Sequence, residues 1–409
     1  MLKEENKELD EMLETLGYKV VSRVVQKRRT PDNRYYVGPG KLEEIKSALG
    51  PLDVERIVVD GVLTPSQHHN IEHELKKDVR DRVWLVLEIF EKNATSHEAK
   101  LQVDLARMQY MAPFIREWIH KAREGEHPGF MGGGEYGLDD YYLFIKRKRK
   151  TIIEQLKRSE AHGTDEKRSL KERGWLVVGL AGYTNAGKST LHDAICKSSV
   201  EISPLMFTTL QPKSSSVAIW NAKAVIEDTI GFVEGLPNDV IEGFRVTLNR
   251  LRNADSVLLV VDAGDSLEGV IRKTKVSWDI LRDSGVQSII PVLNKSDSVE
   301  PGRIPVASNA VKGITGSEPV IVSGKDKLNL DAIFADILIR SRGVSSGTIS
   351  IPQNTAPEVL NSALSNMIIF TITPNDEEIK IEFHCRNELL PKIMYIIKRE
   401  KGTTPNNVL

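Results

Sequence analysis

One eight-residue stretch limits the folds open to this chain more than any other part of the sequence. Residues 182–189, GYTNAGKS, fit the pattern G-x-x-x-x-G-K-[ST] of a phosphate-binding loop. The apolar stretch WLVVGLAG leads into the motif, and STLHDAI, which has a helical pattern, follows it. In this order of strand, turn and helix, inward-facing backbone N–H groups and the helix N-terminus attract phosphate. The sequence therefore predicts an α/β nucleotide-binding domain.

Three later motifs each follow a predicted strand and carry groups suited to a nucleotide. DTIG, residues 228–231, ends the strand KAVIE, and an Asp at this position holds Mg²⁺ through water. NKSD, residues 294–297, follows SIIPVL. The Asp297 carboxylate matches two donors of guanine that adenine lacks, so adenine would leave it unpaired. SGK, residues 323–325, offers a backbone N–H to the guanine carbonyl. Together the motifs predict a site for Mg²⁺ and GTP.

Individual roles follow from the side chains. The predicted catalytic residues are Lys188, which reaches the β- and γ-phosphates, Gly231, whose N–H approaches the γ-phosphate, and a switch threonine within MFTTLQP, residues 206–212. Both Thr208 and Thr209 are available, and we prefer Thr209, which lies 20 residues beyond Ser189.

The predicted Mg²⁺ ligands are Ser189, Thr209 and, through water, Asp228. Asn294 is expected to tether the phosphate loop, and the aliphatic stem of Lys295 to cover the base. The full set of predicted GTP-binding residues is Gly182, Tyr183, Thr184, Asn185, Ala186, Gly187, Lys188, Ser189, Thr190, Phe207, Thr208, Thr209, Leu210, Gln211, Asp228, Thr229, Ile230, Gly231, Asn294, Lys295, Ser296, Asp297, Ser323, Gly324 and Lys325.

The residue after DTIG bears on the rate of hydrolysis. Many related enzymes have a glutamine there that orients the attacking water, whereas this chain has Phe232, which has no hydrogen-bonding group. We expect slow intrinsic turnover that a partner accelerates. The alternative is a binding module gated by GTP, with negligible turnover.

The N-terminal part of the chain alternates between strand and helix patterns. Strands are predicted at residues 18–25, 56–61 and 83–90, and a helix is predicted to start at Pro65 with Thr64 as its cap. These elements predict a small α/β domain with a parallel sheet. The turn GPGK, residues 38–41, lacks the full spacing of a phosphate loop and is a weak candidate for a second nucleotide site.

Two long helices are predicted next, at residues 96–121 and 138–173, joined by a glycine-rich break at 127–137. Residues 141–173 hold 11 Lys/Arg and 5 Asp/Glu, a local balance of +6. Such a helix either contacts RNA backbone or is a solvated face, and composition leaves both open. His68, His69 and His73 have spacing that suits either a metal or a solvated helix face.

The predicted domains are an α/β domain at 1–95, a helical hairpin at 96–173, a GTPase domain at 174–342, a linker at 343–353 and a small α+β domain at 354–409. The net charge of −1 excludes a grossly basic chain. Two cysteines, Cys196 and Cys385, predict no disulfide partner and a reducing cytoplasm. The charged opening segment and the apolar runs predict neither a signal peptide nor a membrane span.

Longer stretches are similar to one known family. YYVGPGKLEEI, DGVLTPSQHHNIE and DRVWLVLEIFEKNATSHEAKLQVDLARMQY, with GYTNAGKSTL, FTTL and DTIGFVEGLPNDVIEGFRVTL, resemble the HflX family of translation-factor-related GTPases, particularly its archaeal members. The resemblance covers residues from about 35 to 325. Two departures are Gln211, where the family commonly has Asp, and the absence of twin arginines after Glu135.

The resemblance implies a GTPase domain after an N-terminal domain with a helical hairpin. It also implies binding to the large ribosomal subunit, with the N-terminal part on ribosomal RNA, and a part in ribosome rescue or splitting under stress. The family's switch threonine aligns with Thr209, and ATP hydrolysis described for the family draws attention to residues 38–41. The resulting prediction is a Mg²⁺-dependent, monomeric GTP hydrolase that controls ribosome association.

Overall fold

The computed structural model describes residues 2–28, 30–49, 54–94, 96–123, 134–196, 214–219, 222–229, 231–341, 343–353, 361, 364, 367–374, 378–387 and 389–401. These residues form two compact units. One unit comprises the described parts of residues 1–159 and 234–246, and the other comprises those of 160–204, 211–233 and 247–409. The helix α6 (Gly134–Glu172) contributes residues to both units.

The second unit is built on a six-stranded sheet, counted over the described residues, with the order β4-β5-β3-β6-β7-β8. Its strands are β3 (Leu176–Gly182), β4 (Ser214–Ile219), β5 (Ala222–Asp228), β6 (Ser256–Asp262), β7 (Ile289–Asn294) and β8 (Val320–Ile321). Only β4 runs antiparallel to its neighbour within that sheet. The strands predicted before the phosphate loop, DTIG, NKSD and SGK are confirmed as β3, β5, β7 and β8.

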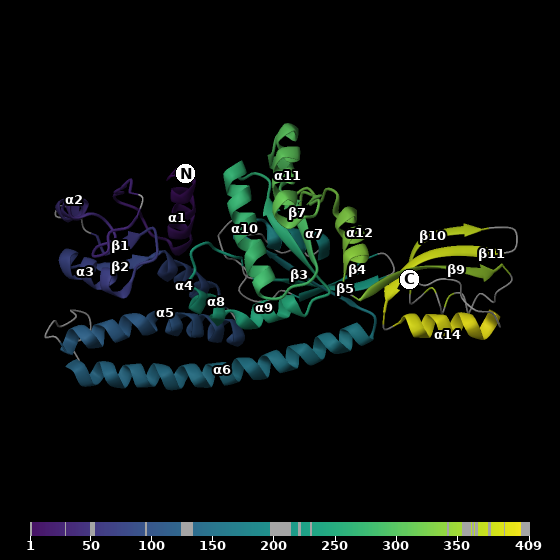
Figure 1. Ribbon diagram of the computed structural model, residues 1–409, viewed down its shortest axis with the longest axis horizontal. Helices are drawn as coiled ribbons and strands as arrows, with labels where there is room; N and C mark the ends of the chain where they lie inside the picture. Colours follow the sequence, from purple (N-terminus) through teal and green to yellow (C-terminus); the bar gives the residue numbers. More distant parts are fainter. Residues whose placement is uncertain are drawn as a thin grey trace. The chain divides into compact units, whose positions relative to one another are not determined.

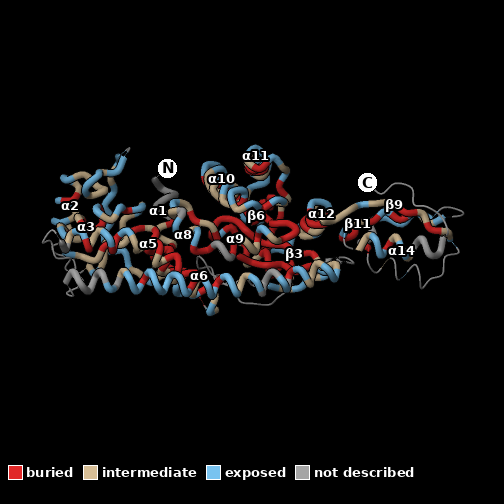
Figure 2. Tube along the Cα trace, turned by 60° about the horizontal axis from the view of Figure 1, so that its bottom comes forward, coloured by how far each residue is buried: buried red, intermediate tan, exposed pale blue. Residues whose placement is uncertain are grey.

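Helices cover both faces of this sheet (Figure 1). One face packs on α7 (Lys188–Cys196) and α12 (Leu330–Arg340) through residues such as Leu180, Ile226 and Leu191. The other packs on α9 (Arg245–Arg252), α10 (Leu267–Asp283) and α11 (Ile304–Thr315). The strands lie in the buried centre of the unit, as the red β3 and β6 of Figure 2 show. The parallel strands of such a sheet all have their carboxyl ends on the same side, and ligands bind in the crevice just beyond those ends.

The same unit ends in a three-stranded antiparallel sheet, ordered β10-β11-β9 over the described residues, with α14 (Leu390–Lys401) packed on it. The strands β10 (Ile368–Pro374) and β11 (Glu378–Arg386) lie in the segment predicted as a small α+β domain. The predicted linker is wrong, because most of its residues form β9 (Val344–Pro352). Its Ser and Gly residues suggested a loop, but pairing with β11 and the alternating burial of Ile349 and Ile351 stabilise a strand.

The first unit holds α1 (Leu2–Leu16), α2 (Pro39–Leu49), β1 (Arg56–Val59), α3 (Pro65–Leu75), β2 (Asp78–Asp81) and α4 (Arg82–Asn93). Its β1 and β2 form a parallel pair. The predicted cap is confirmed, because Thr64 accepts the N–H of Gln67, whose side chain accepts the N–H of Thr64 in return.

Two predicted strands of this unit are wrong. Residues 83–90 lie in α4. Asp81 is the N-cap of this helix, because its side chain accepts the N–H of Trp84. An apolar run of eight residues fits a buried helix as well as a strand, so periodicity could not separate them. Residues 18–25 form no strand, and Val20, Val21, Val24 and Val25 are exposed. Paired rather than alternating valines give that segment no single apolar face to bury.

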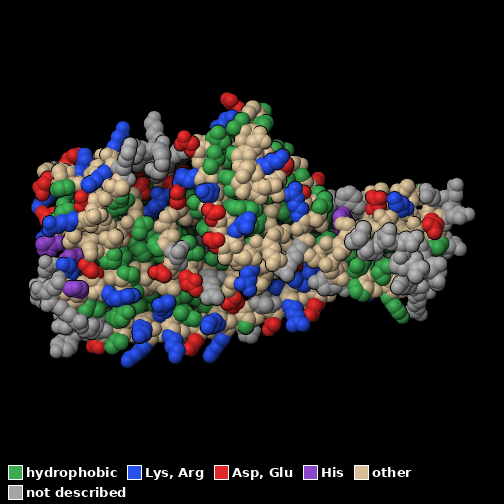
Figure 3. Space-filling model, in the orientation of Figure 1, with side chains coloured by type: hydrophobic (Ala, Val, Ile, Leu, Met, Phe, Trp, Pro, Cys, Tyr) green, Lys and Arg blue, Asp and Glu red, His purple; other side chains and the backbone are tan. Residues whose placement is uncertain are grey.

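The hairpin prediction is confirmed in its two helices, α5 (His97–Arg123) and α6. The glycine-rich break lies mostly outside the described residues. Lys146–Lys150 of α6 are exposed, and Figure 3 shows a row of basic side chains along the helix. The first unit also includes α8 (Asn238–Gly243), which packs on α5 so closely that a Cβ on Gly243 would lie 2.6 Å from the Cβ of Ala106. None of the described helices is long and apolar enough to span a bilayer.

Candidate functional site

The phosphate loop joins β3 to α7 and holds its lysine in a buried position. The Lys188 ammonium is 7% exposed and donates to the backbone carbonyls of Gly182, at 3.2 Å, and Tyr183, at 3.0 Å. Burial lowers the pKa of Lys188 to about 8. The amine therefore lies inside the loop, where an anionic phosphate would offset the cost of burying its charge.

Two of the predicted metal ligands meet beside the loop. The hydroxyl of Ser189 donates to the Asp228 carboxylate at 2.8 Å, and Asp228 is 0% exposed. Asp228 is the last residue of β5, and the next residue, Thr229, donates its hydroxyl to the carbonyl of Leu180 on β3. The pairing of β5 with β3 thus brings together two oxygens that lie 39 residues apart in the sequence.

Gly231 and Phe232 lie against the loop through their backbones. The amide of Phe232 donates to the carbonyl of Gly182 at 3.0 Å, and the amide of Thr184 donates to the carbonyl of Phe232 at 2.8 Å. The Phe232 side chain packs against the core beneath α10. A Cβ on Gly231 would lie 2.8 Å from Thr184 and 2.9 Å from the Lys188 amine, so only glycine fits there.

Asn294 ties the phosphate loop to the base-recognition loops. Its amide donates to the carbonyl of Ala186 at 3.0 Å, and its oxygen accepts the N–H of Gly324 at 2.9 Å. Gly187 lies so close that a Cβ would meet the Asn294 amide at 2.4 Å, and its φ of +86° also favours glycine. The predicted tether is present, and Asn294 also engages the Gly324 N–H of the SGK segment.

The predicted guanine-recognition residues lie together. Asp297 is exposed, and its carboxylate accepts the hydroxyl of the buried Ser323 at 2.6 Å. Lys295 has a left-handed backbone with φ of 62° and pairs with Asp262 at 2.7 Å. Asp262 was missed by the sequence analysis, although its place at the end of β6 is the signal that marks Asp228 on β5.

The remaining predicted residues divide into three groups, of which the first lies in the phosphate loop. Asn185 there is exposed and has a left-handed backbone, with φ of 61°, whereas Thr184 is buried. Tyr183 is also buried, with the Lys273 ammonium 5.2 Å from its ring centroid. Thr190, Ser296 and Lys325 lie on the elements that carry these loops. The last group, Phe207, Thr208, Thr209, Leu210, Gln211 and Ile230, falls outside the described residues.

The two secondary candidates have structural partners. His68 is buried on α3, and its Nε2 lies 2.9 Å from the carbonyl of Val79. The described residues contain no group of three or more His, Cys, Asp or Glu that could hold a metal ion. Residues 39–41 of the predicted GPGK turn form the start of α2 instead. The Gly38 N–H donates to Gln26, and Lys41 pairs with Glu44 on the surface.

Family models match three successive parts of the chain. Residues 3–91 match "GTP-binding GTPase N-terminal", 93–169 match "GTP-binding GTPase Middle Region", and 177–295 match "50S ribosome-binding GTPase". The GTPase HflX of Methanocaldococcus jannaschii is 34% identical over 97% of this chain and 96% of its own length. The chain belongs to the HflX family of GTPases.

Other HflX members agree with this assignment. The Thermococcus kodakarensis GTPase HflX is 40% identical over 72% of this chain, and the match spans 66% of that relative. Among solved structures, SsGBP in complex with GDP is 27% identical, covers 82% of this chain and 94% of its own, and has a TM-score of 0.46. As an HflX GTPase, the chain binds and hydrolyses GTP.

Proposed function

We propose that this chain hydrolyses GTP with Mg²⁺ at the edge of the β3–β5–β6–β7 sheet. The observation that supports this best is the convergence of Lys188, the Ser189–Asp228 pair, Asn294 and Asp297 from three separate motifs. Lys188 turns from the Gly182 and Tyr183 carbonyls to the β- and γ-phosphates, and Asp297 binds the two guanine donors. Thr209 and Gly231 complete the proposed γ-phosphate contacts, and Thr209 joins the proposed metal ligands.

The residues present fit a divalent cation. Ser189 and Asp228 bring hard oxygen ligands within 2.8 Å of each other, as Mg²⁺ prefers, and the buried Thr184 hydroxyl has no hydrogen-bond partner in the described part of the chain. When bound, Mg²⁺ neutralises charge on the phosphates. Ser189 would hold it directly and Asp228 through water. The protein's own contribution is positioning and a fixed electrostatic environment.

We propose further that the GTP cycle controls association with, or splitting of, the large ribosomal subunit, in the cytoplasm and as a monomer. The family model over residues 177–295 is described as a 50S ribosome-binding GTPase. The exposed basic stretch Lys146–Lys150 on α6 offers charges for ribosomal RNA phosphates, of which Lys148 has a weak pair with Asp104 at 3.4 Å.

The test is GTP turnover by the purified chain, with and without purified large subunits. We expect low basal turnover that rises strongly with subunits, because Phe232 uses its backbone in the loop and its side chain in the core. Ser189→Ala is the matched variant, and we expect its Mg²⁺-dependent affinity to fall. Unchanged affinity and turnover would reject the metal role.

The packing of Phe232 also favours a second candidate, a GTP-gated module that binds ribosomes with negligible turnover. The two differ in one result. GTP-dependent subunit binding without stimulated turnover would favour the gated module, and absence of both would reject the ribosomal proposal.

A further inference from the structure

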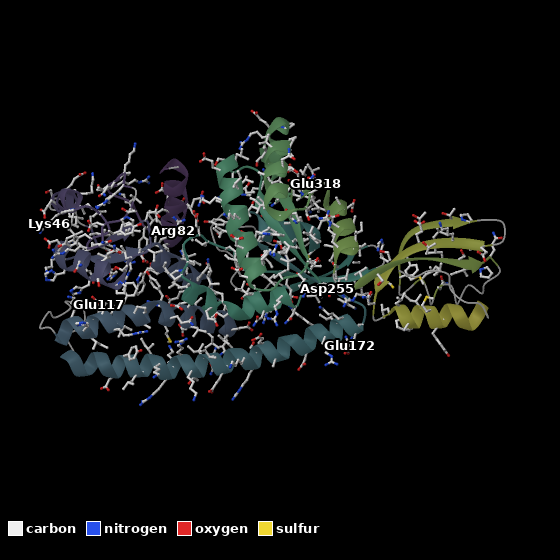
Figure 4. The ribbon with its side chains drawn as sticks, in the orientation of Figure 1. Lys46, Arg82, Glu117, Glu172, Asp255 and Glu318 are labelled. Carbon is white, nitrogen blue, oxygen red and sulfur yellow. The ribbon has the colours of Figure 1, made fainter. Side chains whose placement is uncertain are left out.

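The C-terminal part of α6 is fixed to the GTPase sheet by two lysines one turn apart. Lys167 donates to Glu227 at 2.7 Å and to the carbonyl of Arg250 at 3.2 Å. Lys171 pairs with Asp255 at 2.9 Å and donates to the carbonyl of Asn253 at 2.8 Å. Figure 4 labels Asp255 near this end of α6. The two anchors share one construction, a carboxylate and a backbone carbonyl for each ammonium.

The anchors differ in what lies next to each carboxylate. Glu227 directly precedes Asp228 on β5, and successive residues of a strand point to opposite faces. Glu227 therefore faces Lys167, while Asp228 faces Ser189 on α7. Asp255 precedes β6 at the edge of the sheet opposite the phosphate loop, and it also accepts the N–H of Val177.

We infer that Lys167 is a positioning residue for Asp228, acting through Glu227. This inference rests on the proposed role of Asp228 in holding Mg²⁺. The Lys167 and Glu227 side chains are only 9% and 10% exposed, so each depends on the other for its charge. Because Glu227 and Asp228 are neighbours on β5, a shift of the β5 backbone at Glu227 would move Asp228 relative to Ser189.

Through its place on α6, the Lys167–Glu227 pair would let that helix influence Asp228. α6 is continuous from Gly134 to Glu172, and the same helix carries the exposed basic stretch Lys146–Lys150. A shift of the C-terminal part of α6 would act on Lys167, and through it on the strand end that carries Asp228.

The test measures release of a fluorescent GDP analogue from the full chain across a Mg²⁺ titration, with and without chelator. The measured quantity is the Mg²⁺ concentration at which release is slowed to half of its full extent. Lys167→Met should raise this concentration about tenfold, the usual effect of losing a residue that orients a metal ligand. Two variants are controls. Lys171→Met removes the other buried lysine contact of α6, and Arg168→Met removes a positive charge from the exposed face of the same helix. Both should leave that Mg²⁺ concentration within about twofold of the parent.

A double variant guards against misfolding. Lys167→Met combined with Glu227→Met replaces the buried ion pair with apolar side chains, which proteins often tolerate, and it should still require more Mg²⁺. An unchanged Mg²⁺ requirement in both Lys167 variants, or an equal rise in Lys171→Met, would overturn the inference and leave the pair a structural anchor. If Mg²⁺ does not slow release from the parent chain, the proposed metal site fails as well, which is a separate result.

Discussion

Asp228 and Asp81 are both fully buried aspartates at the carboxyl end of a parallel strand, yet their hydrogen-bond partners differ in kind. Asp81 ends β2 and accepts the amides of Leu63 and Trp84 and the hydroxyl of Tyr110. Its acceptors are used by the fold, and it caps α4. Asp228 ends β5 and accepts the hydroxyl of Ser189, which itself belongs to the phosphate-loop motif.

The comparison shows that burial and strand position do not by themselves identify a site. What separates the two carboxylates is the origin of their donors. Backbone amides and a buried Tyr fix Asp81 in place, whereas Asp228 accepts a side-chain hydroxyl of the phosphate loop, which the proposed Mg²⁺ would bind instead. Burial raises the pKa of Asp81, and its hydrogen bonds oppose that rise, as expected of a group retained for structure.

The largest expected effect comes from the phosphate loop. Lys188→Met should lower GTP turnover about 10²- to 10³-fold, because a fixed positive charge at the phosphates is lost. The nucleotide-free protein should unfold at no lower temperature, since the ammonium is buried at a cost. Single-turnover assays and thermal unfolding measure the two effects. A variant that unfolds earlier but turns over normally would assign Lys188 to the structural class of Asp81.

The structural aspartate should behave in the reverse manner. Asp81→Ala should lower the free energy of unfolding of the N-terminal unit by about 3 kcal/mol, because a helix cap and further hydrogen bonds are lost. Basal GTP turnover of the folded fraction should persist. Urea unfolding followed by tryptophan fluorescence measures the loss, with the half-exposed Asp104→Ala as the control. Equal stability of the two variants would contradict this assignment.

The base-recognition loop tests specificity rather than stability. Asp297→Asn should reduce the preference for GTP over ATP about 10²-fold, because an amide offers one acceptor where guanine presents two donors. The fold should be kept, since the amide oxygen still accepts the Ser323 hydroxyl. Competition binding measures the preference, with Asp326→Asn, an exposed residue of the turn after Ser323, as the control. Retained discrimination would locate base recognition elsewhere.

The smallest effect concerns pH in the N-terminal unit. Burial lowers the pKa of His68 to about 4 and raises the pKa of Glu72 to about 7, from 6.5 and 4.5. Between pH 4.5 and 6.5 the unfolded chain gains one proton at His68 and lacks one at Glu72, so the two slopes cancel.

Glu72→Gln removes one side of this balance. The variant should lose stability as pH falls from 6.5 to 4.5, by about 1 kcal/mol per pH unit relative to the parent. Unfolding free energies across this range measure the difference. Parallel curves for variant and parent would show that the two side chains do not compensate each other.

The sequence predicts the GTPase sheet well because each site motif follows its own apolar strand, so β3, β5 and β7 could be placed by their motifs. It predicts the N-terminal unit less well. The charged segment DVRD forms β2, while the apolar run after it forms α4, because Asp81 caps a helix there. Pairings between distant residues, such as Lys295 with Asp262 and Lys167 with Glu227, have no local signal and required the structure.

Two backbone hydrogen bonds join Phe232 to the phosphate loop. Because both use backbone groups, they form whatever side chain follows DTIG. Gly235, three residues further on, has a φ of +78° and open space where a Cβ would lie. The chain therefore leaves the phosphate loop through a position that favours glycine for its backbone conformation alone.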